Sequence, residues 1–327
     1  MTLCVSWIRK VNNNEELIFA TDSCLSGGER WHSGVKLFEL PRKDCLICFA
    51  GETNRTYPLI LNLISSIKFD EHLSSSHTDV SEVLEYLSNL FTTLCNSISD
   101  YGTQNFKDVL GEFEFLFGGW SWRQGRFRLW KLKYKFETSA FVHDEVNDEG
   151  MFYEFIGDET QKAESLLEEE IKNNGKILYR HFDMEPFKVL LSMIREDEYT
   201  TIDGAIQIAK IHPPGSTEFF GVLWPSIDGK KTFLGKDVSF ENNPAVNFID
   251  PDTATIIGEE LPEKLTIIDE VTYGVNTEFV KKCYPTGTLK PELTKRENHI
   301  LKSIFNDIAY SRFLDSENAE IENAQQQ

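Results

Sequence analysis

The second residue of this chain can do chemistry if the first is removed. The chain begins Met1-Thr2-Leu3, and the small side chain of Thr2 permits trimming of the initiator methionine. The new N-terminus would carry a hydroxyl and a free α-amine, which is a nucleophile with its own base. A nearby cation lowers the cost of forming the alkoxide and keeps the amine unprotonated near neutral pH. Lys36 suits the role of this cation, and Asp22 suits that of the carboxylate that holds it.

Short strands must bring these residues together. The apolar runs near the start predict four strands joined by tight turns, at 3–8, 17–23, 35–40 and 45–51. Thr2 begins the first strand, Asp22 closes the second, and Lys36 begins the third. The turn CFAGET closes the fourth strand, and backbone N–H groups in such a turn can stabilise an oxyanion.

The rest of the chain alternates between groups of strands and pairs of helices. Apolar residues recur at helical spacing in 57–67, 83–94, 159–171, 183–194 and 298–313. Two strand groups, 113–157 and 205–235, lie between or after the helix pairs. This order differs from the βαβ alternation of a parallel sheet, and it suits two antiparallel sheets stacked face to face. We therefore expect an α+β fold, a four-layer αββα sandwich over residues 1–240. A C-terminal extension with a terminal helix and an acidic tail is expected over 241–327.

Composition limits the partners. The chain has 327 residues, 40% of them hydrophobic, and a formal charge of −20, which argues against nucleic acid and anionic membrane surfaces. No apolar run approaches the ~20 residues of a membrane span, and Arg9 and Lys10 interrupt the first strand too early for a signal peptide. We expect a cytoplasmic protein.

The cysteines indicate packing rather than metal binding. Cys45 and Cys48 form a lone CxxC within an apolar run, with no second CxxC and no histidine pair at ligand spacing. We interpret both as residues of a buried strand. Neither a metal nor a cofactor is expected.

The N-terminal quarter resembles the proteasome β-subunit and its bacterial peptidase relatives, which are N-terminal nucleophile (Ntn) hydrolases of αββα architecture. The resemblance rests on Thr2 and on three short stretches, Ala-Thr-Asp at 20–22, Gly-Val-Lys-Leu-Phe at 34–38 and Phe-Ala-Gly-Glu-Thr at 49–53. It covers about residues 2–240 and is tight only over 2–67. Each of these residues alone is ordinary, and only their joint order indicates a site.

The resemblance implies a role for each matching residue. Thr2 would be the nucleophile with its amine as the base, Lys36 the cation that lowers the pKa of that amine, and Asp22 its anchor. The backbone N–H of Cys48 would be the oxyanion donor. The positions that would pair with an extended substrate as an added strand are Ser26 and Ala50.

Two later stretches depart from the family pattern. A Gly-Ser-Gly is expected before the third helix, but the chain has Gly157-Asp158, with a carboxylate in place of a hydroxyl. A later Asp-x-x-Ser-Gly-Gly is replaced by residues 199–204, where Asp197 or Thr201 could stand in for the missing groups.

The expected function is a threonine-type hydrolase, a peptidase that forms an acyl-enzyme on Thr2. The resemblance implies a peptide or protein substrate, assembly into a homo-oligomer such as a ring, and an unfoldase or regulatory partner. Two alternatives stay open: a catalytically impaired assembly or binding subunit, and a non-peptide amidase on the same fold.

Overall fold

The chain has two compact units. The computed structural model describes residues 2–11, 14–26, 29–75, 77–98, 113–146, 152–173, 182–213, 215–239, 246–257, 276–285, 289–290, 293–305, 307–308 and 311. The first unit spans Met1–Ala254 and the second Thr255–Gln327, whereas the sequence predicted a division after residue 240. Met1 and the tail 315–327 lie outside the described residues.

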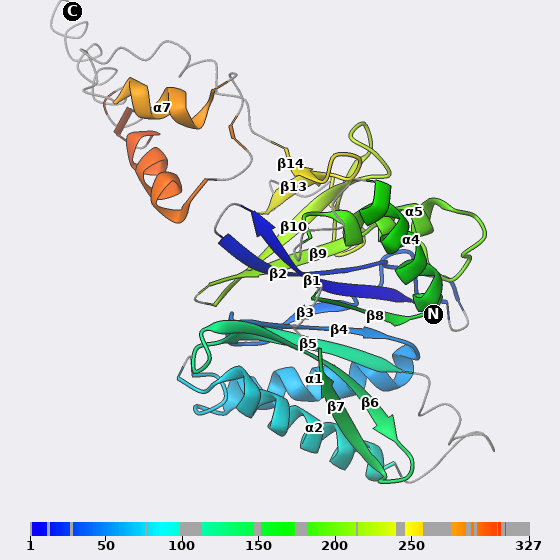
Figure 1. Cartoon of the computed structure of the whole chain (residues 1–327). Helices are drawn as coiled ribbons and strands as arrows, with labels where there is room; N and C mark the ends of the chain where they lie inside the picture. The colour runs from blue at the N-terminus through cyan, green and yellow to red at the C-terminus, as the bar shows by residue number, and fades with distance from the viewer. Residues whose placement is uncertain are drawn as a thin grey trace, which may run out of the picture. The chain divides into compact units, whose positions relative to one another are not determined.

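The first unit contains two β-sheets and the helices that pack on them (Figure 1). The larger sheet includes β1 (Leu3–Val11), β2 (Asn14–Thr21), β8 (Tyr153–Gly157), β9 (Gln207–His212), β10 (Ser216–Trp224), β11 (Lys230–Phe233), β12 (Lys236–Asp237) and β13 (Asn247–Asp250). The smaller sheet is made of β3 (Leu37–Glu39), β4 (Cys45–Ala50), β5 (Glu114–Ser121), β6 (Arg126–Lys135) and β7 (Ala140–Glu145). The helices are α1 (Thr53–Phe69), α2 (Val80–Asn96), α4 (Thr160–Asn173) and α5 (Glu185–Arg195).

The sheets differ in how their strands pair. The larger sheet has the order β12-β11-β10-β9-β2-β1-β8, and β13 joins β10 as a parallel neighbour, with Phe220 opposite Asn247. The smaller sheet has the order β3-β4-β5-β6-β7 and is antiparallel throughout. The four strands predicted near the N-terminus and the helices predicted at 57–67 and 83–94 are confirmed.

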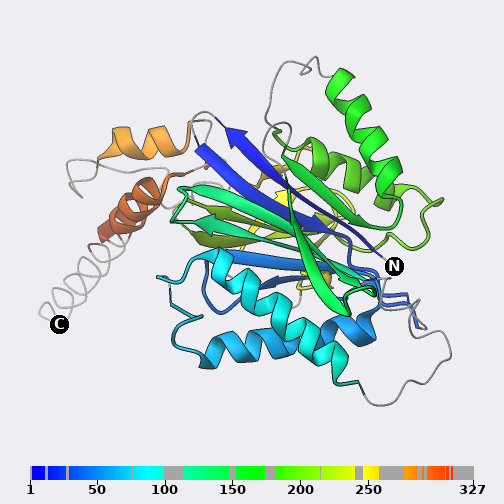
Figure 2. The same ribbon diagram turned by 60° about the horizontal axis from the view of Figure 1, so that its bottom comes forward.

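Helices α1 and α2 cover one face of the smaller sheet, as Figures 1 and 2 show. The strand β4 explains how the sheet is buried on both sides. Cys45, Ile47 and Phe49 face the helices, while Leu46 and Cys48 face the larger sheet. All six residues of β4 are buried, so the run CLICFA has no polar alternation. The interpretation of the CxxC as part of a buried strand is confirmed.

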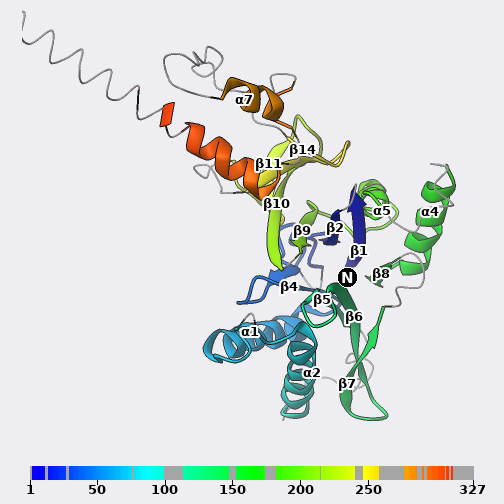
Figure 3. The same cartoon turned by 60° about the vertical axis from the view of Figure 1, so that its left-hand side comes forward.

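Helices α4 and α5 pack on each other and on strands β8, β1 and β2 of the larger sheet (Figure 3). The indole N–H of Trp7 in β1 donates to the carbonyl of Asp183, just before α5, at 2.8 Å. Arg9 reaches the carboxylate of the same Asp183 at 2.7 Å. These bonds fix the start of α5 against the first strand.

The predicted four-layer αββα sandwich of two antiparallel sheets is wrong for this chain. The structure has one mixed and one antiparallel sheet, because β13 joins β10 in the parallel direction. Residues 230–250 also add β11, β12 and β13 beyond β10. The Pro- and Asp-rich composition after residue 240 predicted turns, so it contained no signal for a parallel strand there.

The second unit contains β14 (Thr255–Ile256), α7 (Thr277–Cys283) and a helical stretch at 295–305. A small core holds it together, formed by Val280, Cys283, Tyr284, Leu301 and Ile308. The predicted terminal helix at 298–313 coincides with this stretch up to residue 305, and residues 312 and 313 lie outside the described part of the chain.

Two features are absent from the described residues. None of their helices is both long and apolar enough to cross a membrane. No group of three or more His, Cys, Asp or Glu side chains among them could hold a metal ion.

Candidate active site

A buried ion pair lies between the two sheets near the chain start. The Lys36 ammonium is 2.9 Å from Oδ1 and 2.8 Å from Oδ2 of Asp22. Both side chains are 0% exposed. Asp22 directly follows β2 of the larger sheet, and Lys36 directly precedes β3 of the smaller sheet. The structure thus brings together two of the residues that the sequence singled out.

The Asp22 carboxylate also binds the backbone of the first strand. Oδ1 accepts the N–H of Leu3 at 3.2 Å, and Oδ2 accepts the N–H groups of Cys24 at 3.0 Å and Asp203 at 3.4 Å. Burial raises the pKa of Asp22, while the Lys36 ammonium and these N–H groups oppose that rise. The Asp22 carboxylate therefore connects the backbone N–H of Leu3, the residue after Thr2, to the Lys36 ammonium.

Thr2 is held by the turn that follows β8. Its carbonyl accepts the backbone N–H of Asp158 at 2.8 Å. Gly157 has φ +104°, and a Cβ there would come within 2.0 Å of the Thr2 carbonyl oxygen and 2.9 Å of the Ala50 Cβ. Only glycine fits this close approach. Thr2 is 2% exposed and lies beside the end of β4.

The two departures from the expected motifs meet in space. Thr201 donates its hydroxyl to Oδ2 of Asp158 at 2.7 Å. Asp158 stands where a hydroxyl was expected, and Thr201 was one of two residues that could replace the missing later groups. The sequence placed a carboxylate and a hydroxyl in separate stretches, and the fold pairs them next to Thr2.

Cys48 lies in the interior of β4. It is opposite Leu37 of β3 and Leu116 of β5, and both neighbouring strands pair with it. Burial raises the pKa of its thiol well above the usual value, and the neighbouring Cys4 thiol adds to this. Because β4 pairs with a strand on each side, the backbone N–H of Cys48 faces a paired strand. Its role as the oxyanion donor stays a prediction.

The two predicted substrate-binding positions differ in their surroundings. Ala50 ends β4 opposite Glu114 of β5 and lies against Gly157 at the Thr2 turn. Ser26 is half-buried in the loop after Asp22, next to the isolated bridge between Leu25 and Trp31. Pairing of a substrate with either position stays a prediction.

Sequence reasoning missed two residues of this site. Asp203 donates its N–H to Asp22, and Gln207 bonds the backbone of both Asp22 and Lys36. Gln207 had a recognisable signal, because it is a single amide at the start of the apolar run AIQIAKI. Asp203 acts through its backbone N–H, so its residue type gave no signal in the sequence.

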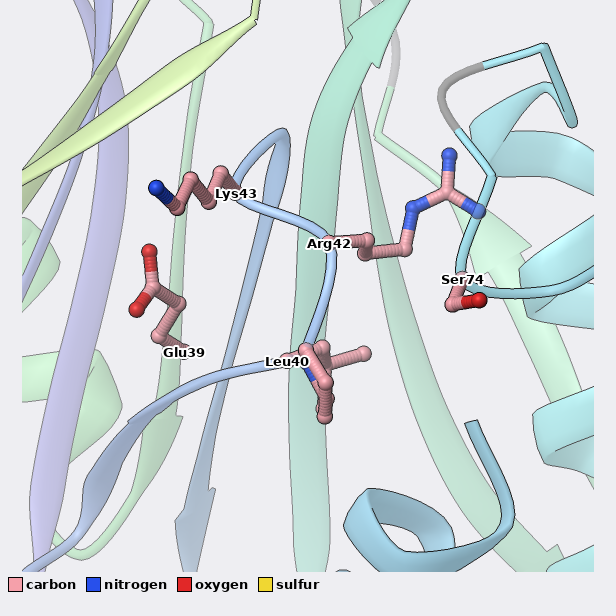
Figure 4. A pocket seen from close by; sticks show the side chains of 6 residues that line it. Glu39, Leu40, Arg42, Lys43 and Ser74 are labelled. Atoms are coloured by element: carbon pink, nitrogen blue, oxygen red, sulfur yellow. The ribbon is translucent and has the colours of Figure 1, made fainter. Parts of the chain in front are cut away.

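A pocket of about 420 Å³ lies elsewhere, at the β3–β4 turn (Figure 4). Its lining residues are Glu39, Leu40, Pro41, Arg42, Lys43 and Ser74. The Arg42 guanidinium is already bonded to Asp44 at 2.6 and 2.7 Å and to the carbonyls of Leu73 and Thr78. This pocket contains none of the residues around Thr2.

Comparisons with known proteins gave likenesses only at the level of solved structures. No family model matches the chain, and no curated protein does. Similar solved structures include an Anbu mutant from Hyphomicrobium sp. strain MC1, at 12% identity over 65% of this chain and 83% of that chain, with a TM-score of 0.44. The helical assembly of the Anbu complex from Pseudomonas aeruginosa is 16% identical over 67% of this chain and 87% of that chain, with a TM-score of 0.48. Anbu (ancestral beta-subunit) from Yersinia bercovieri is 16% identical over 64% of this chain and 82% of that chain, with a TM-score of 0.45.

The assignment to the proteasome β-subunit and its family of Ntn hydrolases is therefore corrected. The three solved structures named above are Anbu proteins, which form a distinct family, and no family model matches the chain. The resemblance depended on short stretches at strand ends, where residues such as Asp and Gly are common for reasons of turn geometry. Because each TM-score is below 0.5, any functional proposal rests on this chain's own residues.

Proposed function

We propose that this chain hydrolyses amide bonds, with Thr2 as the nucleophile once Met1 has been removed. The hydroxyl of Thr2 attacks the amide carbonyl while its proton passes to the freed α-amine. The C–N bond then breaks, the leaving amine takes up that proton, and the acyl group stays on Thr2 as an ester. Water hydrolyses this ester to a carboxylic acid and restores the Thr2 hydroxyl. One observation carries the proposal. A fully buried Lys36–Asp22 pair is bonded to the N–H of Leu3, directly after Thr2.

The chemistry of that pair supports the proposal. A buried ion pair costs several kcal/mol of desolvation per ion, so it is a poor means of stabilising a fold. A cation close to an N-terminal threonine disfavours protonation of its α-amine and favours the alkoxide form of its hydroxyl. The substrate class we propose is a peptide or protein segment, which would extend past Ser26 and Ala50.

The test begins with the mature N-terminus. Intact-mass measurement should show loss of Met1, and a threonine-reactive β-lactone probe should then label the wild type but not Thr2→Ala. The matched control is Thr138→Ala, an exposed threonine in the β6–β7 turn, which should label normally. Retention of Met1, or equal labelling of Thr2→Ala, would overturn the proposal.

A second candidate is an assembly subunit without hydrolysis. The observation in its favour is the burial of Thr2, which is 2% exposed. Light scattering should find a homo-oligomer, and its persistence in Thr2→Ala without probe labelling of the wild type would favour this candidate.

A further inference from the structure

The first residue of β9, Gln207, is a completely buried side-chain amide at 0% exposure. Its Oε1 accepts the backbone N–H groups of Lys36 at 3.0 Å and Leu37 at 3.3 Å. Its Nε2 donates to the carbonyls of Gly34 at 2.5 Å and Asp22 at 3.5 Å. Four bonds are the full capacity of an amide. Because two partners are N–H groups and two are carbonyls, only one orientation of the amide satisfies them all.

This amide bridges the two sheets. Gln207 pairs with Thr21 of β2 in the larger sheet, whereas Leu37 begins β3 of the smaller sheet and Lys36 directly precedes it. The core between the sheets is built of apolar side chains such as Phe19, Leu46, Leu116, Leu129 and Ile211. Gln207 is thus a polar connection through an apolar layer.

The Lys36–Asp22 ion pair also connects the two sheets, next to Gln207. Asp22 comes from the larger sheet and Lys36 from the smaller, so their separation depends on how the sheets are placed. Gln207 bonds the backbone carbonyl of Asp22 and the backbone N–H of Lys36. It therefore holds the main chain of both partners, while their side chains bond each other.

We propose that Gln207 is a positioning residue of the Thr2 site, which holds the Lys36 ammonium and the Asp22 carboxylate in register across the two sheets. The kinetic consequence rests on the proposed function of Thr2. A displacement of about 1 Å in such a site costs up to about 100-fold in rate.

The test uses Gln207→Glu, which keeps the shape but replaces both N–H donors. Its matched control is Gln161→Glu, the same change on the exposed side of α4. At about pH 8 the ionised carboxylate would face the carbonyls of Gly34 and Asp22, and we expect probe labelling of Thr2 to slow about 10- to 100-fold. Towards about pH 5 the buried carboxyl regains a proton and a donor, so the rate relative to wild type should recover. A merely structural role would leave the pH profile of the rate unchanged in shape. Identical profiles for Gln207→Glu and the wild type would overturn the proposal.

A second measurement needs neither a folded variant nor activity. Native-state hydrogen exchange on the wild type should show the Lys36 and Leu37 amides protected almost to the level of global unfolding. Fast exchange of both amides would overturn the proposal, whatever Thr2 does. If the wild type fails to label, the hydrolase proposal falls. Protection of these two amides in the wild type would still support the hold of Gln207 on the main chain at Lys36.

Discussion

Thr201 donates its hydroxyl to the carboxylate of Asp158 at 2.7 Å, and Asp158 donates its backbone N–H to the Thr2 carbonyl at 2.8 Å. These two bonds connect the loop before β9 to the first described residue of the chain. They fix the orientation of the Asp158 side chain beside Thr2. A hydroxyl and a carboxylate that are far apart in sequence therefore form one polar group at the candidate site.

Replacing Thr201 by valine should slow the chemistry of Thr2. The change keeps the shape of the side chain but removes a bond to Asp158, and hydrogen bonds to charged groups contribute about 1.5–3 kcal/mol. We expect probe labelling of Thr2 to fall by about tenfold and Thr201→Ser to restore it. The control is Thr138→Val on an exposed turn. Normal labelling of Thr201→Val would show that the Asp158 side chain has no part in the reaction.

Removing Lys36 should strongly destabilise the fold. Lys36→Met leaves the Asp22 carboxylate buried without its counter-ion, which costs about 3–5 kcal/mol in free energy of unfolding. Urea denaturation measures this, and the double variant Lys36→Met/Asp22→Leu should recover part of the loss. Lys172→Met is the control, because Lys172 pairs with Glu168 at 3.4 Å on an exposed helix face and such pairs contribute about 0.3–0.5 kcal/mol. Equal losses in the two lysine variants would contradict the special place of Lys36.

Gly157→Ala should be much more harmful than Gly125→Ala. Both glycines have positive φ, +104° and +64°, but a Cβ at Gly157 would meet the Thr2 carbonyl oxygen at 2.0 Å, whereas nothing lies within 4 Å at Gly125. The backbone cost alone is about 1 kcal/mol and applies to both. We expect Gly157→Ala to cost at least about 2 kcal/mol more, through the clash with the Thr2 carbonyl. Chemical denaturation of both variants checks this, and similar midpoints would contradict it.

Stability should decline on both sides of an optimum because of a charge cluster on β2, β9 and β10. Glu16 bonds Lys210 at 3.0 Å and His212 at 3.2 Å, and His212 bonds Glu218 at 2.9 Å. Burial opposes ionisation of Glu16, but the bonds from His212 and Lys210 outweigh it and lower its pKa from 4.5 to about 2. Burial likewise opposes protonation of His212, but Glu16 and Glu218 outweigh it and raise its pKa above the ordinary 6.5.

The direction in which each group changes the free energy of unfolding with pH follows from the difference between its folded and unfolded pKa. Glu16 stabilises the fold above about pH 4.5, and this contribution is lost as the pH falls from there towards about 2. His212 stabilises it below about pH 6.5, and this contribution is lost as the pH rises through its raised pKa. Urea unfolding across pH should show both declines, and His212→Gln should remove the alkaline one. The exposed His77→Gln should keep it, and an alkaline decline that survives in His212→Gln would rule out this source.

Local patterns predicted the elements well. The apolar run 45–51 predicted a buried strand. In the structure Cys45 and Cys48 lie on opposite faces of β4, and both faces are covered. The helical spacing of Ile60, Leu63 and Ile67 predicted α1, whose inner face contains these residues. Such patterns reflect burial of one element and need no knowledge of its neighbours.

Long-range pairing could not be predicted in the same way. The bond between Gln207 and Lys36 joins positions 171 apart in sequence, and no local periodicity encodes such a distance. The parallel neighbour β13 has four residues, Asn247–Asp250, too few for a periodic signal. Asp22 and Lys36 were found because they lie at strand ends close to Thr2, whereas the wrong family assignment came from the same kind of strand-end residues.

The candidate site draws its carboxylate from one sheet and its ammonium from the other. While the chain is still folding, with the sheets apart, each of these groups is an ordinary solvated charge. The pair is assembled only when the two sheets dock. A threonine that depends on this pair would be inert in a nascent or partly unfolded chain, so such a chain could not cleave itself or its neighbours before it was complete.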